Sequence, residues 1–539
     1  MPGKKKHKAG AKRSRSQSKK DKESDQPTEE LKEHKKENAE RPDDSIKSNT
    51  VTDIAKAKPV VDERVPERHS YEVYIDQEEN TIYHTSLMLT DLKNNNNKYY
   101  IAQLLKSKAE ADQYMVYYKW GRVGYTGGCS NSIFYDITSA KAEYHKKIES
   151  KIKTGYSEIK INFTEEENKT ENKTESAIKS KKVEEPKIEK EPESKLDIRV
   201  QELIKLIFDM NMMQKEMEAQ GYDTKKMPLG KLSKETVQEG FKWLKIISDV
   251  IDGKEKGDLY NLSSKFYTAI PHDFGFKKMR NFVITTNKVL KEKIEMVQTL
   301  GEIEIASKML EEKKAASIDS IIDQHYERLH CQITPIEKKS EEFELLSEYV
   351  TNTHGETHSF KVDIDKAYKI DREGEDERFI KKIGNDMLLW HGSRLSNFVG
   401  ILSQGLRIAP PEAPVTGYMF GKGVYFADMV TKSAQYCNAS NSNDHVGLML
   451  LCRVAIGNPR SLNKADSNAN DLPEGSNSTL GLGKNSPPEI SYKKFRGMSI
   501  PIGKAEKVDD VKRSLQYNEY IVYNVEQVKL EYLLKMKFK

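Results

Sequence analysis

Three short motifs in the last third of the chain place a reactive side chain beside apolar residues. His391 follows one apolar run, Tyr425 lies inside another, and Glu519 lies in the strand-like run Tyr517–Val525. Alternation with a period of two would place Tyr517, Glu519 and Ile521 on one strand face, with Glu519 as the only carboxylate of that run. A carboxylate there could orient or deprotonate a hydroxyl group, or hold developing positive charge. Taken singly, each motif has a structural alternative, because strand glutamates are mostly solvated and tyrosines mostly pack in cores.

A mixed α/β pattern surrounds these motifs and sets the boundaries of the domain that must position them. From about residue 321 to residue 539, short apolar runs alternate with Gly- and Pro-rich loops, which predicts an α/β domain over 321–539. The expected strands are Met387–Trp390, Val424–Phe426, Val446–Val454 and Tyr517–Val525.

An all-helical domain is predicted over 196–312. Apolar residues recur there at steps of three and four, which is the spacing of an amphipathic helix. The first such run predicts one helix, whose methionines we interpret as core residues, through Leu196, Val200, Leu203, Ile207, Met210, Met213 and Met217. Ser233 is the expected N-cap of a second helix, whose apolar face would hold Val237, Phe241, Leu244, Ile247 and Ile251.

A small β-rich module is predicted over 69–163. Strands are expected at Thr85–Leu92 and Tyr99–Leu105, on either side of an asparagine-rich turn, and in the aromatic run Tyr114–Trp120. A helix is expected over 138–153, where apolar residues lie four apart.

Two segments have compositions that cannot bury a core. Residues 1–68 are predicted to form a disordered tail, with nine Lys or Arg and no acidic residue in the first 20 positions. Residues 164–195, with ten acidic and eight basic residues, are predicted to form a flexible linker. The basic clusters are typical of nuclear import and nucleic-acid binding, and the alternative is a solvated terminus without a partner.

Several other functions are not supported by the pattern. No run of 18 apolar residues exists, and no apolar stretch of a secretory signal opens the chain, so no membrane role is expected. The four cysteines are dispersed, and the pair His354 and His358 lacks the glutamate of a His-Glu-x-x-His site, so no metal is expected. Gly421-Lys422-Gly423 does not fit a P-loop, and no Gly-x-Gly-x-x-Gly motif indicates a Rossmann fold.

In this order, His391, Tyr425 and Glu519 resemble the His-Tyr-Glu triad of the poly(ADP-ribose) polymerases. The stretch Gly400–Pro414, GILSQGLRIAPPEAP, is similar to the DNA-dependent members of that family almost residue by residue. Lys119–Gly124 resembles the WGR domain, and Met227–Leu232 together with Phe266–Gly275 resembles the regulatory helical domain. Each of these motifs stands in the family's domain order.

The resemblance covers residues 71–539 and extends to the domain layout. A short basic tail, a WGR domain, a helical domain and a transferase domain, without zinc fingers before them, resemble the type 2 branch of the family. Asp323–Tyr326 and Leu329–Cys331 favour the same branch. The implied fold class is a multidomain chain with a disordered basic tail, a small β-rich WGR domain, an all-α regulatory bundle and an α/β ADP-ribosyltransferase domain.

The resemblance implies an enzyme that consumes NAD as a substrate and uses no metal. Breaking the bond between nicotinamide and ribose passes through a positively charged, oxocarbenium-like ribose, which Glu519 would hold. The nicotinamide side would be bound by the Gly392 backbone, the Ser433 hydroxyl and the rings of Tyr436 and Tyr425. By the same resemblance the remaining contacts would be His391 on the adenine-side ribose, Ser393, Asn397 and Arg407 on the ADP portion, and Lys432 and Met419 on the acceptor side.

DNA recognition is expected from the tail and from Trp120, Gly121 and Arg122, through phosphate contacts and stacking on a break end. The alternative for Trp120 and Arg122 is a packing or interdomain role that relays DNA binding. The resemblance implies a nuclear enzyme activated by single- or double-strand breaks, whose helical domain obstructs NAD entry until DNA binds. Acceptor proteins would include the chain itself and histones, with a histone PARylation factor as a further partner. A mono(ADP-ribosyl) transferase of the WGR-containing type and an inactive DNA-end scaffold are the alternatives.

Overall fold

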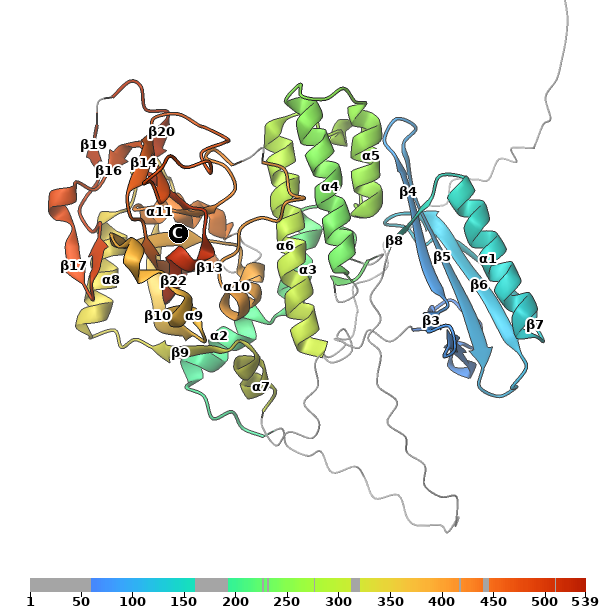
Figure 1. The fold of residues 1–539 in the computed structure, drawn as a ribbon. Helices are drawn as coiled ribbons and strands as arrows, with labels where there is room; N and C mark the ends of the chain where they lie inside the picture. The colour runs from blue at the N-terminus through green and yellow to red at the C-terminus, as the bar shows by residue number, and fades with distance from the viewer. Residues whose placement is uncertain are drawn as a thin grey trace, which may run out of the picture. The chain divides into compact units, whose positions relative to one another are not determined.

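The computed structural model describes residues 60–159 and 192–539, except residues 225, 226, 230, 231, 276, 312–319, 416, 417, 440–444 and 509 (Figure 1). Most of the tail predicted over 1–68 and of the linker predicted over 164–195 therefore lies outside the described residues. Residues 60–68 are an exception to the tail prediction. Val65 is buried in the β-rich part, and the Asp62 carboxylate pairs with Lys119 Nζ at 2.8 Å. The folded part therefore begins before residue 69.

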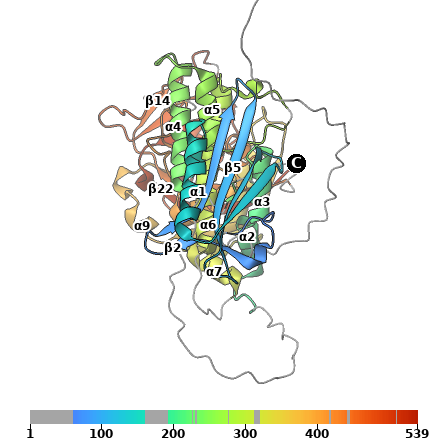
Figure 2. The ribbon, with the colours of Figure 1, turned by 90° about the vertical axis from the view of Figure 1, so that its right-hand side faces the viewer.

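The β-rich part is an antiparallel sheet with one covering helix. Its strands run in the order β7-β6-β5-β4-β8, and β1 pairs with β5. The side chains of Ala140, Tyr144 and Ile148 on the helix α1 pack against the sheet, and Figure 2 shows α1 running beside β5. The elements are β1 (Tyr71–Val73), β2 (Ile75–Asp76), β3 (Thr81–Ile82), β4 (His84–Asp91), β5 (Asn96–Ser107), β6 (Tyr114–Arg122), β7 (Gly128–Phe134), α1 (Ile137–Lys153) and β8 (Ser157–Ile159).

The helical part contains α2 (Ile198–Ile207), α3 (Met210–Ala219), α4 (Lys234–Ile251), α5 (Leu259–Ala269) and α6 (Asn287–Glu311). The prediction of one helix through Leu196–Met217 is wrong, because the chain breaks between α2 and α3. Asp209 causes the break: its carboxylate accepts hydrogen bonds from the backbone N–H groups of Asn211 and Met212 and so caps a new helix. The predicted N-cap Ser233 and the predicted burial of the methionines are confirmed.

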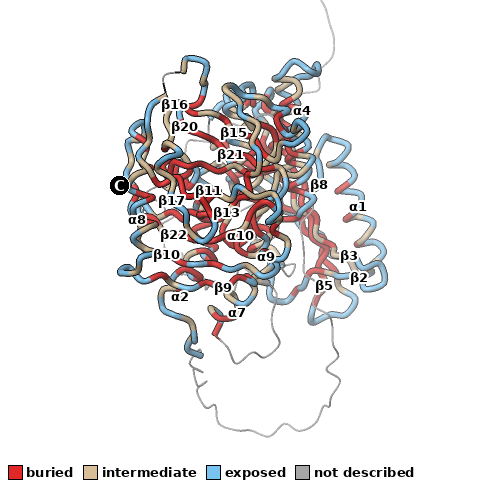
Figure 3. The backbone as a smooth tube through the Cα atoms, turned by 60° about the vertical axis from the view of Figure 1, so that its left-hand side comes forward, coloured by how far each residue is buried: buried red, intermediate tan, exposed pale blue. Residues whose placement is uncertain are grey.

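The C-terminal part is built on two main sheets. A seven-stranded sheet has the order β17-β18-β11-β13-β22-β10-β9, and a four-stranded sheet has the order β12-β21-β15-β14. The elements are α7 (Ile321–Arg328), β9 (Cys331–Pro335), α8 (Glu341–Asn352), β10 (Val362–Arg372), α9 (Glu375–Arg378), β11 (Asp386–Gly392), α10 (Phe398–Gln404), β12 (Val424–Phe426), α11 (Val430–Ala434), β13 (Val446–Ala455), β14 (Pro459–Leu462), β15 (Ser478–Gly481), β16 (Gly483–Ser486), β17 (Lys493–Phe495), β18 (Met498–Ile500), β19 (Glu506–Lys507), β20 (Leu515–Tyr517), β21 (Glu519–Val522) and β22 (Val528–Phe538). Figure 3 shows the buried residues concentrated along the central strands.

The predicted strand Tyr517–Val525 is in fact two strands. β20 ends at Tyr517 and pairs with β16, whereas β21 starts at Glu519 and pairs with β12 and β15. The prediction that Tyr517 shares a strand face with Glu519 and Ile521 is therefore wrong, whereas Glu519 and Ile521 lie in one strand. The chain passes from one sheet to another at Asn518, whose side chain accepts a hydrogen bond from Gly483 N at 2.8 Å.

Two further observations concern functions that the composition argued against. None of the described helices is long and apolar enough to cross a membrane. In the described part of the chain, no three His, Cys, Asp or Glu side chains gather as a metal site would require. His354 and His358 lie beyond the end of α8, so they do not share a helix face.

Candidate active site

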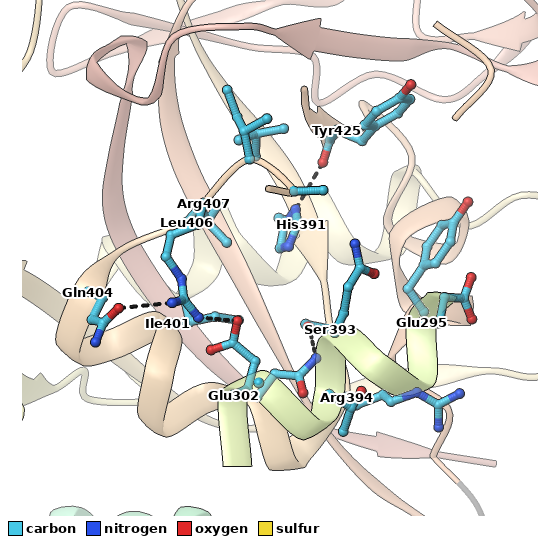
Figure 4. Close-up of a pocket in the computed structure, with 18 of the residues that line it drawn as sticks. Glu295, Glu302, His391, Ser393, Arg394, Ile401, Gln404, Leu406, Arg407 and Tyr425 are labelled. Carbon is cyan, nitrogen blue, oxygen red and sulfur yellow. Dashed lines mark hydrogen bonds and ion pairs between the residues drawn. The ribbon is translucent and has the colours of Figure 1, made fainter. Parts of the chain in front are cut away.

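A cavity of about 1280 Å³ lies between α6 and the strands β11, β12 and β21 (Figure 4). It is larger than the roughly 300–1,000 Å³ of typical small-ligand pockets. The cavity brings together every residue that the sequence placed near NAD or the acceptor: His391, Gly392, Ser393, Asn397, Arg407, Met419, Tyr425, Lys432, Ser433, Tyr436 and Glu519. These residues come from seven separate elements and loops, so only the folded chain makes them neighbours.

The imidazole of His391 is held in one orientation at the end of β11. Its Nδ1 lies 2.9 Å from the carbonyl oxygen of Tyr425, and this contact is drawn in Figure 4. A carbonyl oxygen only accepts hydrogen bonds, so Nδ1 carries the proton and Nε2 is left as an acceptor. Burial lowers the pKa of His391, although the bond to the Tyr425 carbonyl opposes this. A neutral imidazole with a free Nε2 acceptor suits a ligand hydroxyl.

We expect the pH profile of kcat/KM for NAD to show this neutral state. Because the pKa of His391 lies below its ordinary value, titration of His391 should leave kcat/KM constant from about pH 6.5 upward. Activity should fall only at lower pH, where protonation turns Nε2 into a donor. The measurement is the profile of the wild type beside His391→Gln, in which the acid limb should disappear. An acid limb centred above about pH 6.5, or one that persists in the variant, would contradict the assignment.

Tyr425 is fixed through both its backbone and its hydroxyl. Its strand β12 pairs with β21, and the adjacent Ala427 exchanges two backbone hydrogen bonds with Trp390 of β11. The Tyr425 hydroxyl donates to the Gly421 carbonyl at 2.7 Å and accepts from Phe420 N at 3.0 Å. Burial raises the pKa of Tyr425, so the phenol stays neutral. β12 therefore connects the strand of His391 with the strand of Glu519.

Glu519 is buried at the start of β21 and pairs with a lysine. Its carboxylate lies 2.5 Å from Lys432 Nζ, and the two side chains are 8% and 18% exposed. Burial alone would lower the pKa of Lys432, but the Glu519 carboxylate raises it above its ordinary value. Lys432 therefore stays charged beside Glu519, in a cavity wall where both groups remain accessible to a ligand.

The residues predicted to bind nicotinamide line the cavity where β11 approaches α11. A Cβ atom on residue 392 would lie 1.9 Å from the Ser433 carbonyl oxygen, so only glycine permits the approach of β11 to α11. The Ser433 hydroxyl donates to the Trp390 carbonyl at 2.9 Å, and its lone pairs remain available to an amide donor. The ring of Tyr436 is 40% exposed, with the ammonium group of Lys432 5.8 Å from its centre.

Helix α6 forms the opposite wall, and the sequence analysis missed its contribution. Glu302 on α6 forms an ion pair with Arg407, while Gln298 donates to the Tyr418 hydroxyl. Figure 4 shows Arg407 directed at Glu302 and Gln404 rather than into an open site. Arg407, predicted to contact the ADP portion, is thus already engaged by the helical part. Glu295, Gln298 and Glu302 follow the three- and four-residue spacing of one helix face, but this spacing alone does not indicate a cavity wall.

A second ion pair joins the loop after β11 to the helical part. Arg394 lies 3.1 Å from Glu216 of α3, and the two side chains are 16% and 8% exposed. Nearby, Asn397 Nδ2 donates to the Ser393 hydroxyl at 2.9 Å. The loop that carries Ser393 and Asn397 is therefore tied to the helical domain in this structure.

The predicted DNA-contacting residues lie at one end of β6 and differ in their surroundings. The indole of Trp120 is 41% exposed and stacks on Tyr100 with ring centres 6.3 Å apart. Gly121 allows a close approach, because a Cβ there would lie 2.8 Å from Gly127 Cα. Arg122 instead donates to the Asn95 carbonyl at 2.9 Å, and the Asn95 side chain accepts from Met279 N of the helical part at 3.1 Å. Trp120 is thus exposed to solvent, whereas Arg122 lies at an interdomain contact.

Comparisons with known proteins account for almost all of the described chain. Residues 340–538 match the poly(ADP-ribose) polymerase catalytic domain, residues 194–326 match the poly(ADP-ribose) polymerase regulatory domain, and residues 83–163 match the WGR domain. Poly(ADP-ribose) polymerase 2 of Arabidopsis thaliana is 43% identical over 505 residues, which are 90% of this chain and 78% of that protein. The human poly(ADP-ribose) polymerase 2 is 40% identical over 521 residues, which are 93% of this chain and 86% of that protein. Poly(ADP-ribose) polymerase 2-A of Oryza sativa subsp. japonica is 43% identical, over 93% of this chain and 77% of its own length.

Proposed function

We propose that this chain, which belongs to the poly(ADP-ribose) polymerase family, builds chains of ADP-ribose on proteins in response to DNA strand breaks. It is an ADP-ribosyltransferase that resembles the type 2 polymerases, and this family consumes NAD as its substrate. The observation that carries the proposal is the cavity in which His391, Tyr425 and the Glu519–Lys432 pair face a wall made by the regulatory helix α6.

The proposed reaction exchanges one bond at the anomeric carbon of the nicotinamide ribose. The bond to the nicotinamide nitrogen breaks with its electron pair, so that the positively charged ring leaves as neutral nicotinamide. A hydroxyl oxygen of the acceptor then bonds to that carbon, and its proton passes to the Glu519 carboxylate. The ribose carries positive charge in between, so a carboxylate near a ribose hydroxyl interacts more strongly in the transition state than in the bound substrate. Glu519 is the group proposed for this role, with Lys432 beside it on the acceptor side.

Activation by DNA is supported by continuous contacts from the WGR domain to the cavity wall. Asn97 of β5 donates to the His272 carbonyl at 2.7 Å, and His272 Nε2 lies 2.9 Å from Lys293 Nζ on α6. Thr90 N and Leu92 N of the same hairpin donate to hydroxyl groups of α5 at 3.0 Å each. α6 then carries Gln298 and Glu302 into the cavity. A shift of the WGR domain could therefore bias the position of α6.

The exposed indole of Trp120 gives a prediction about DNA affinity. Trp120→Ala should weaken binding of nicked DNA about tenfold, since stacking on an aromatic ring contributes roughly 1–3 kcal/mol per base. The rate at saturating DNA should stay near that of the wild type, because Trp120 makes no contact with the helical domain among those described.

The matched variant is Asn97→Ala, which removes the bond to His272 inside the interdomain contact. It should lower the stimulated rate at saturating DNA and leave DNA affinity within about threefold. Fluorescence anisotropy of labelled nicked DNA gives the affinity, and release of nicotinamide gives the rate. The interpretation is wrong if both variants change the same quantity.

Localisation and partners complete the proposal. The basic clusters in residues 1–20 support residence in the nucleus, where DNA with single- or double-strand breaks would be the activating partner. Acceptors would be proteins, including this chain itself and histones, with a histone PARylation factor as a candidate partner by family resemblance. No metal is required by the proposed chemistry, since Glu519 and Lys432 supply the charges.

The experiment that tests the proposal is incorporation of labelled NAD by the purified full-length chain, with and without nicked, 5′-phosphorylated DNA, resolved on a denaturing gel. A high-mass smear that appears with DNA supports a DNA-activated polymerase. A single sharp band would replace the polymerase by the mono(ADP-ribosyl) transferase alternative. Equal incorporation without DNA would contradict the proposed activation.

A further inference from the structure

One fully buried carboxyl group lies behind the cavity and takes no part in the chemistry proposed above. Asp428 has no solvent exposure and stands three residues after Tyr425 and four residues before Lys432. It therefore occupies the connection between β12 and α11, the two elements that supply the tyrosine and the lysine of the cavity. A buried carboxyl group has an energetic cost unless its hydrogen bonds are made.

The bonds of Asp428 go to both neighbours of Glu519. Its Oδ2 accepts from Asn518 Nδ2 at 2.8 Å and from the Tyr520 hydroxyl at 3.3 Å. The Asn518 side chain in turn accepts from Gly483 N at 2.8 Å, which ties the connection between β20 and β21 to β16. One oxygen atom thus joins the segment of Tyr425 and Lys432 to the residues on either side of Glu519.

The surroundings of Asp428 are neutral. The groups that face its carboxyl group are Tyr349 of α8, Tyr492 before β17, and Asn518 and Tyr520. Within the described ranges no lysine or arginine forms an ion pair with it, and its Oδ1 has no hydrogen-bond partner. Burial raises the pKa of Asp428 to about 7, against which the bonds from Asn518 and Tyr520 act. Ion pairing therefore does not explain why an aspartate occupies this buried position.

We propose that Asp428 is a positioning residue, which fixes Glu519 relative to Tyr425 and Lys432 through its hydrogen bonds to Asn518 and Tyr520. The inference rests on the proposed role of Glu519. Strand pairing holds Glu519 on one side only, at Gly481 of β15, because the chain leaves one sheet at Tyr517 and joins another at Glu519. The hydrogen bonds of the Asn518 side chain to Asp428 and Gly483 fix the chain where it passes between the two sheets. A displacement of a catalytic group by about 1 Å can cost as much as 10²-fold in rate.

The experiment compares three variants of the full-length chain with saturating nicked DNA. Asp428→Leu removes the acceptor while keeping an apolar side chain of similar size, and Asp428→Asn keeps an oxygen that can accept the same bonds. The control is Asp386→Leu, which removes another mostly buried carboxylate of the same domain, one that pairs with Arg453 away from the cavity. For each variant, kcat and KM for NAD, the inhibition constant of nicotinamide, and Tm are measured.

Asp428→Leu should lower kcat about tenfold, while KM and the nicotinamide inhibition constant change less than about threefold. Asp428→Asn should keep kcat within about threefold of the wild type, because its amide oxygen restores the bonds. Asp386→Leu should lower Tm without lowering kcat. The inference is overturned if Asp428→Leu keeps its kcat, if the asparagine variant is as slow as the leucine variant, or if the control loses kcat to the same extent.

Two features keep the outcome interpretable. If the leucine variant does not fold, Asn518→Ala removes the same bond from the other side, and an unchanged kcat in that variant overturns the inference. Nicotinamide release is read for every variant as a ratio to the wild type, whether the product is a polymer or a single unit. Failure of the polymerase proposal would appear in the wild-type product, and failure of this inference would appear in the ratios.

Discussion

Replacing Glu519 by glutamine should lower kcat for ADP-ribosyl transfer by about 10²–10³-fold, the usual loss when one group that stabilises transition-state charge is removed. Glutamine has nearly the same shape and still offers a carbonyl oxygen to a ribose hydroxyl. It lacks the negative charge that pairs with Lys432 and that would hold the positively charged ribose. KM for NAD should change by less than about threefold, because the lost interaction belongs mainly to the transition state.

The measurement for this variant is steady-state nicotinamide release, supported by a single turnover with enzyme in excess over NAD. The matched control is Glu531→Gln on β22, which neutralises another buried glutamate of the same domain that does not line the cavity. That control should keep kcat within about threefold. A loss of less than about tenfold in Glu519→Gln, or an equal loss in the control, would remove Glu519 from the proposed role.

Three of the four strands expected in the catalytic domain were predicted correctly. The strand expected at Val424–Phe426 has those bounds as β12, and the expected strands around Met387–Trp390 and Val446–Val454 are found as β11 and β13. These runs are apolar except for Arg453 near the end of the last one, and they are bounded by glycine-rich or polar segments. A run that is buried on both faces could be a helix or a strand, and the short length of these runs favours strands.

Two errors in the prediction have the same cause, a polar residue inside an otherwise continuous pattern. Asp209 interrupts the run of apolar residues from Leu196 to Met217 and caps a second helix. Asn518 interrupts the run from Tyr517 to Val525 and marks the passage between two sheets. A periodic pattern is judged over a window of many residues, so one polar residue within the window does not change the prediction. The hydrogen bonds that such a side chain makes decide whether the element continues.

The cavity wall on α6 was beyond prediction for a different reason. Helical spacing groups Glu295, Gln298 and Glu302 on one face, but polar residues on one face of a helix usually face water. Their partners Tyr418 and Arg407 lie more than 100 residues further along the chain. Which face of a helix packs across a domain boundary depends on both surfaces, and local sequence specifies only one of them.

The contact between α6 and Arg407 leads to a prediction about activity without DNA. Glu302→Gln should raise the DNA-independent rate about 30-fold, which corresponds to about 2 kcal/mol within the usual range of 1–3 kcal/mol for coupling between sites. Glu302 holds Arg407 in an ion pair, and Gly400 leaves the space for this contact, since a Cβ there would lie 1.9 Å from the Glu302 carboxylate. Burial raises the pKa of Glu302, and the bond from Arg407 acts against that shift. The Arg407 guanidinium therefore offsets part of the cost of burying the Glu302 carboxylate while α6 lies against the cavity.

Without that charge, α6 loses a main attachment to the catalytic domain and Arg407 is released to meet the ADP portion of NAD. The rate at saturating DNA should stay within about threefold of the wild type, so the factor of stimulation should fall by nearly the same 30-fold. The matched control is Glu239→Gln on α4, where the glutamate pairs only with the exposed Lys242 on its own helix among the contacts described.

The measurement is the initial rate of nicotinamide release with and without nicked DNA. A DNA-independent rate equal to that of the wild type would mean that α6 does not restrain the cavity through Glu302. A fall of both rates would mean instead that Glu302 supports the catalytic domain itself.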